Sequence, residues 1–159
     1  MGKTDSEHDF DDMSWHDNII YGLRFNVGDA SQGDWRHDLI LDIDYIVEWV
    51  RGGERGARFR VAPATLTFHE VTDLRINVDF GDSDSRTAIN DLSIANVTRS
   101  VVDDTQRFPN RDYYRWQIEL NLPQGGEFIF GARGSPKRCA ASRCRAMSRA
   151  CRQVTGARI

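Results

Sequence analysis

Apolar and polar residues alternate along several stretches in the first 130 residues. The clearest alternation lies in Tyr114–Leu122, where large apolar side chains take turns with Arg, Gln, Glu and Asn. A period of two places successive side chains on opposite faces of an extended strand. This stretch therefore predicts a strand with one buried face. Ile19–Val27 predicts another, with these residues on its buried face: Ile19, Tyr21, Leu23, Phe25 and Val27.

The stretch Leu39–Val50, LILDIDYIVEWV, alternates in the same way but contains two aspartates. Its β-branched and aromatic composition favours a strand over a helix. About a dozen residues exceed the usual strand length, so we predict a bulge near Tyr45–Val47, with a helical turn as the alternative. One predicted face holds Leu39, Leu41, Ile43, Tyr45, Val47 and Trp49. The other holds Asp38, Ile40, Asp42, Asp44, Ile46 and Glu48, and we expect Asp42 and Asp44 to face solvent.

Proline and glycine mark further boundaries. Pro63 lies between two alternating runs, and because it cannot donate a ladder hydrogen bond, it predicts an edge position or a break between two strands. The uneven spacing of apolar residues in Leu92–Val97 predicts a bulged strand. The sequence PQGGE at 123–127 predicts a hairpin turn, with a return strand beginning at Phe128.

These patterns give seven or eight strands at intervals of about ten residues, with no clear helix. They predict an all-β fold, an antiparallel sandwich or barrel with strands in meander-like order. A chain of 159 residues is long enough to bury one core. We expect an acidic disordered tail over 1–14, a single all-β domain over 15–132, and a disordered tail rich in Arg and Cys over 133–159.

Charge and cysteine are distributed unevenly. The residues up to Gly131 include 24 acidic and 13 basic side chains, whereas the rest has eight basic side chains and no acidic one. All three cysteines lie after Gly131, so the body cannot form a disulfide or a thiolate metal site. No apolar run approaches the roughly 18 residues of a membrane span, and the N-terminus is acidic where a secretion signal is basic. We therefore expect a cytoplasmic protein with no membrane partner.

The abrupt change of composition after Ala132 has three interpretations. An arginine-rich tail can bind an acidic partner or nucleic acid through counterion release, although nucleic acid is not the partner we expect. The tail can also be disordered without a role. Finally, it can be an out-of-frame translation, because Arg outnumbers Lys 19 to 2 and wrong-frame reading of GC-rich DNA yields such compositions. A shifted frame would leave the last strand with an unpaired edge that promotes self-association.

Three segments in order, HDLILDIDYIVEW, FRVAPATLTFHEVTDLRINVDF and YYRWQIELNLPQGGEFIFGA, carry a resemblance. Over about residues 15–132 the chain resembles a family of small uncharacterised bacterial proteins, of the kind described as a domain of unknown function. Members of that family look as if they continue past FGA with glycine, phenylalanine and further apolar residues. This chain departs from that pattern at RGSPKRC, which favours the frameshift interpretation. The resemblance implies no activity and no catalytic residue.

Candidate binding residues are few. Imidazole and carboxylate together suit zinc or manganese, but no pair has the spacing of a known signature, so we predict no metal and no cofactor. Asp42 and Asp44 lie about 7 Å apart by strand rise, a spacing that glycosidases use, although isolated pairs are usually solvated. There is no GxSxG motif and no glycine-rich loop before a helix, so we predict no catalytic residue. The weak candidates for binding are His37, Asp38, Asp42, Asp44 and His69.

Two functions remain. The first is a non-catalytic interaction module that meets a basic protein partner with an acidic sheet face, or that associates with itself through an exposed edge strand. The second is a small β-barrel hydrolase or ligand-binding protein with a His/Asp site. The positions of the histidines and aspartates discriminate between them. Gathering around a pocket favours the second, whereas scattering over a solvated sheet favours the first, which we prefer.

Overall fold

The computed structural model describes residues 13–50, 58–81, 88–102, 112–139 and 152–155. These residues form an all-β fold in which every strand pairing is antiparallel. One short 3₁₀ turn, η1 (Ala30–Gln32), lies between the first two strands. The strands are β1 (Ile19–Val27), β2 (His37–Val50), β3 (Arg58–Asn77), β4 (Leu92–Val101), β5 (Tyr113–Leu122), β6 (Glu127–Cys139) and β7 (Arg152–Thr155).

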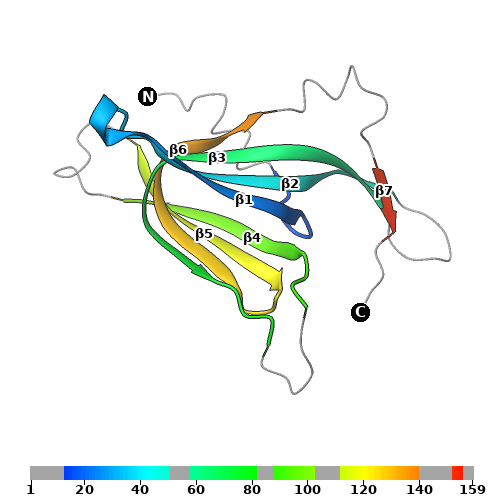
Figure 1. Cartoon of the computed structure of the whole chain (residues 1–159). Coiled ribbons are helices and arrows are strands. Elements are labelled where there is room, and N and C mark those ends of the chain that lie inside the picture. The colour runs from blue at the N-terminus through cyan, green and yellow to red at the C-terminus, as the bar shows by residue number, and fades with distance from the viewer. Residues whose placement is uncertain (1–12, 51–57, 82–87, 103–111, 140–151, 156–159) are drawn as a thin grey trace.

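Six of these strands form a ring. β1, β2 and β3 make one three-stranded meander and β4, β5 and β6 make a second. β3 pairs with β6 on one side of the ring and β1 pairs with β4 on the other. Figure 1 shows the two meanders as two layers, with the long β3 curving from one layer into the other. The predicted antiparallel all-β fold is confirmed, and its arrangement is a barrel-like ring with meander order inside each half.

The interior of the ring holds one apolar core. The alternation predicted for β5 is confirmed through Leu120, because Trp116 and Ile118 are completely buried and Leu120 nearly so, whereas Leu122 at the end of the strand is exposed. Phe68 on β3 lies at the centre and makes edge-to-face contacts with Trp116 and Phe130, at ring-centroid distances of 5.2 and 4.8 Å. Such contacts add to the stabilisation that the rings gain from burial.

β2 contains the predicted bulge. Its register against β3 shifts between Ile46 and Glu48, so the prediction of a bulge near Tyr45–Val47 is confirmed. Leu39, Leu41 and Ile43 are fully buried, as the alternation predicts. The prediction is wrong for Val47 and Trp49, which are exposed, because the extra residue of the bulge changes the alternation after Ile46.

Pro63 lies in a stretch of β3 that has a described strand partner on one side only. β3 is continuous through Pro63, which pairs with Asp44 of β2, so the predicted alternative of a break between two strands is wrong. On the opposite side of β3, the described pairing with β7 ends at Val61 and that with β6 begins at Thr65. Pro63 lies in this gap, where its missing N–H leaves no ladder bond unmade. The predicted edge position is therefore what the structure shows.

The last strands extend beyond the boundary expected at Ala132. The hairpin predicted at 123–127 joins β5 to β6, with the Gly126 N–H donating to the Pro123 carbonyl at 3.0 Å. β6 continues to Cys139 and pairs with both β5 and β3, so the unpaired edge expected for the return strand does not occur there. β7 pairs with the start of β3. Residues 1–12, 140–151 and 156–159 lie outside the described residues, so the tails remain a prediction.

No helix in the described part of the chain combines the length and the apolar character needed to cross a membrane.

Candidate functional site

The predicted binding residues lie along β2 and its neighbour β3. Leu39, Leu41 and Ile43 face the core, so the alternate residues Asp38, Asp42 and Asp44 face the outside of the ring. Asp38 and Asp42 are four residues apart, which is about 13 Å along an extended strand. The candidates on β2 are therefore spread along the strand and do not all gather around one cavity.

Two of the candidates meet. His69 lies across from Asp38, and its Nδ1 is 3.1 Å from the Asp38 Oδ1. Asn26 of β1 donates from Nδ2 to the other Asp38 oxygen at 3.2 Å. The Asp38 side chain is only 8% exposed, whereas 40% of the His69 side chain is exposed. A buried carboxylate thus holds an accessible imidazole between three adjacent strands, an arrangement that can orient a ring for proton transfer.

Asp42 takes part in a separate group. Arg24 Nη2 lies 3.0 Å from the Asp42 Oδ2, and the Thr65 hydroxyl donates to the Asp42 Oδ1 at 2.8 Å. The expected outward direction of Asp42 is observed, but its carboxylate is paired by the protein and is not simply hydrated. Glu48 is paired in a similar way, with Arg60 Nη1 at 3.0 Å. These bonds partly neutralise the acidic face that the sequence offers to a basic partner.

The phenol of Tyr21 lies near the Asp42 group and interacts with it electrostatically. Partial burial raises the pKa of Tyr21, and the negative charges of Asp42 and Asp44 raise it further, while Arg24 opposes them. Tyr21 therefore lies within electrostatic range of both aspartates on the outer surface. Asp44, the fourth candidate, is half-buried and forms interactions of its own.

His37 is separated from the other candidates. It is the first residue of β2, it is exposed, and it shares the Leu39 side of the strand and not the Asp38 side. Its Nδ1 contacts the carbonyl oxygen of Trp35. Within the described ranges, no three His, Cys, Asp or Glu side chains lie close enough together to hold a metal ion.

The feature that the sequence did not predict is an open side of the ring at β1. β1 pairs with β2 along its length, but with β4 only through Ile19 and Ile20. Leu23 and Phe25 lie opposite Leu41 and Leu39, so they belong to the inner face. Leu39 is fully buried, yet Phe25 is 57% exposed and Val27, further along, is 75% exposed. The prediction of a buried face through Phe25 and Val27 is wrong, because no described strand covers this part of β1.

A bulge near the start of β1 separates its two halves. The register against β2 shifts between Ile20 and Gly22, and Tyr21 is consequently exposed on the outside. A Cβ at Gly22 would lie 3.0 Å from the Asp42 Oδ2, so a larger residue here would press on that carboxylate. Residues before the bulge close the ring, and residues after it run along the open side.

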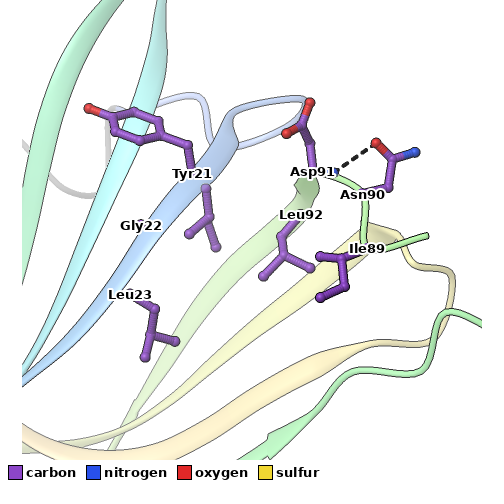
Figure 2. A pocket seen from close by; sticks show the side chains of 8 residues that line it. Tyr21, Gly22, Leu23, Ile89, Asn90, Asp91 and Leu92 are labelled. Carbon is purple, nitrogen blue, oxygen red and sulfur yellow. Dashed lines mark hydrogen bonds between the residues drawn. The ribbon is translucent and has the colours of Figure 1, made fainter.

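A hollow lies at this open side. Its volume is about 360 Å³, and Ile20–Leu23 and Ile89–Leu92 line it. Figure 2 shows the side chains of Leu23 and Leu92 in the space between β1 and the start of β4, with Ile89 beyond Leu92, while Tyr21 points to the other side of β1. The Asp91 carboxylate lies at its rim, pointing away from the leucines, and the Asp91 backbone N–H donates to the Asn90 Oδ1 at 2.9 Å. The surface available for binding is thus apolar with an acidic rim.

The exposed apolar set of this part of the molecule is larger than the hollow itself. Ile89 is exposed, as is Trp35 in the connection between β1 and β2. A protein surface that keeps neighbouring large apolar side chains in water is typical of an interaction site. We define the β1 surface as Leu23, Phe25, Val27, Ile89 and Asp91.

Comparison of the chain with protein-family models, with curated proteins and with solved structures finds no match.

Proposed function

We propose that this chain is a non-catalytic binding module that contacts another protein through the β1 surface. The observation that carries the proposal is the exposure of Phe25, whose partner in the register, Leu39, is completely buried. Full burial of an aromatic side chain stabilises by roughly 1.5–3 kcal/mol relative to its exposure to water. A partner that covers Phe25 would gain part of this free energy. The separation of His37, Asp42 and Asp44 from the contact between Asp38 and His69 also supports a module over an enzyme.

The acidic face that we expected to meet the partner is the weaker candidate. Asp42 and Glu48 are already paired with Arg24 and Arg60, so a basic partner would have to replace these bonds. The β1 surface requires no such exchange. A role in the cytoplasm of a bacterium, inferred from the sequence, is part of this proposal.

Selection from a library of displayed random peptides tests the proposal. We expect the full chain to enrich peptides that bind the wild type and lose binding to Phe25→Asp. The matched control is Val101→Asp, which places the same charge at an exposed valine on β4, away from the β1 surface. Enriched peptides that bind both variants equally, or no enrichment above a bead control, would contradict the proposal. Thermal melts of both variants check that each remains folded.

A second candidate function rests on the contact between Asp38 and His69. An imidazole held by a buried carboxylate can serve as a general base in a small hydrolase. Against this function, the described hollow lies at β1 and Ile89–Leu92, and neither residue of the pair lines it. Ester or phosphate hydrolysis that disappears in His69→Gln but persists in His37→Gln would favour this candidate.

A further inference from the structure

We propose that the partner adds a strand to β1, and that it is an extended segment with apolar side chains at alternate positions and at least one Lys or Arg. This inference rests on the proposed function and specifies how the β1 surface would be used.

The backbone of β1 provides the first argument. In an antiparallel strand, successive N–H and C=O groups point alternately to the two sides. On one side, β1 pairs with β2 from Ile19 to Val27. On the other side, the described pairing with β4 ends at Ile20. Among the described residues, Gly22–Val27 therefore have no strand partner for the backbone groups that point to the open side. A row of such groups is a template for another strand.

The side chains provide the second argument. Leu23, Phe25 and Val27 share one face and are spaced about 7 Å apart along the strand. A strand added beside β1 would place its own alternate side chains next to them, inside the opening of the ring. Apolar side chains at those positions would complete the core that Leu39 and Leu41 already form on β2. The intervening side chains of the added strand would face outward.

Charge provides the third argument and selects the partner. Asp91 lines the hollow and is exposed, and it forms no ion pair with another described residue. β1 itself offers no acid, and its one charged side chain, Arg24, is paired with Asp42. A basic segment is therefore attracted to this rim, whereas the β1 strand of a second copy would offer only Arg24, which already pairs with Asp42.

Titration of synthetic peptides into the isotope-labelled full chain tests the proposal. The probe is an eight-residue peptide of alternating valine and lysine with blocked ends, and the first comparison peptide has glutamate in place of lysine. We expect shift changes in the amide spectrum at Gly22–Val27 and Ile89–Leu92, and binding at least tenfold weaker for the glutamate peptide. Equal affinities for the two peptides would overturn the choice of a basic partner.

Backbone methylation tests strand addition separately. Two further peptides carry N-methyl groups on alternate amides, one along each edge of the extended peptide. Because only one edge can pair with β1, we expect one of these peptides to lose binding and the other to keep it. Equal retention by both would overturn strand addition while leaving a binding module in place. In contrast, failure of the display selection would remove the binding module itself.

Two variants and one hydrodynamic measurement complete the test. Asp91→Asn is expected to weaken the lysine peptide ~2–5-fold, the size of an exposed ion pair, and the matched exposed carboxylate Asp112→Asn to leave it unchanged. Equal effects of the two variants would contradict the role of Asp91.

Sedimentation of the chain without peptide is expected to show no dimer that depends on β1. A dimer lost in Phe25→Asp but not in Val101→Asp would identify a second copy as the occupant and overturn the proposal.

Discussion

Phe25 on β1 and Leu39 on β2 are register partners on the inner face of the ring, yet Leu39 is fully buried and more than half of Phe25 is exposed. The difference arises from the other neighbour of each strand. β2 has β1 on one side and β3 on the other, whereas β1 has β4 beside it only at Ile19 and Ile20. Burial of an inward-facing side chain in this protein therefore depends on how far the strands on both sides extend.

Truncation of these two side chains should have very different effects on stability. Leu39→Ala removes a buried side chain and leaves a cavity, so we expect the free energy of unfolding to fall by about 2–5 kcal/mol. Phe25→Ala removes an exposed ring, and we expect a loss below about 1 kcal/mol. Urea denaturation followed by tryptophan fluorescence measures both. Equal losses would mean that Phe25 is buried in solution.

Asn18 should be one of the most sensitive polar positions. Its side chain is completely buried, donating to the carbonyl oxygens of Ser14 and Trp15, both at 2.9 Å, and accepting from the Ile46 N–H at 2.7 Å. Asn18→Ala leaves these backbone groups without partners, so we expect a loss of about 2–3 kcal/mol in urea denaturation. The control Asn96→Ala, an exposed position, should lose less than about 1 kcal/mol; a comparable loss would contradict this account.

The contact between Asp38 and His69 gives a structural prediction whether or not the protein is an enzyme. Asp38→Ala removes the group that orients the imidazole and leaves Asn26 without its acceptor, so we expect a loss of about 1–2 kcal/mol. The ring nitrogen resonances of His69 should change in this variant. His37→Ala, which alters an exposed histidine on the other side of the strand, should change neither quantity. Unchanged His69 resonances in Asp38→Ala would show that the contact does not persist in solution.

Acid titration should reveal a local ion pair near the start of β2. Hydrogen bonds from the Arg36 side chain and backbone lower the pKa of Asp34 from 3.8 to about 2. Because the folded-state pKa lies below the ordinary value, the contribution of this pair to stability is present above pH 3.8 and is lost as the pH falls toward 2. Carboxyl resonances of Asp34 should titrate near pH 2 in the wild type and closer to 3.8 in Arg36→Gln. A midpoint of 3.8 in the wild type would contradict the pairing.

The sequence predicts much of the fold because strand alternation is a local signal. Alternate residues of β2 and β5 are buried as their spacing indicates: Leu39, Leu41, Ile43, Trp116, Ile118 and Leu120. The bulge after Ile46 could also be predicted, because the stretch Leu39–Val50 is longer than a usual strand. In contrast, the bulge at Tyr21 falls within a regular alternation and leaves no signal except Gly22.

The candidate site could be predicted only in part. Asp38 and His69 were both candidates, but their contact depends on the register between β2 and β3, which joins residues 31 positions apart. The exposure of Phe25 and Val27 depends on where the pairing of β1 with β4 ends, at Ile20. Alternation within one strand contains no information about the length of its neighbour. The β1 surface therefore had no signal in the sequence taken strand by strand.

Amide hydrogen exchange of β1 tests the central claim most directly. If Gly22–Val27 have a strand partner on one side only, about half of their amides point to the open side and should exchange much faster than the rest. The amides of Trp116–Leu120 on β5, which pairs with both β4 and β6, should all be protected. Uniform protection of Gly22–Val27 at the level of β5 would show that another segment covers this edge, and it would contradict the open side on which the proposed binding surface depends.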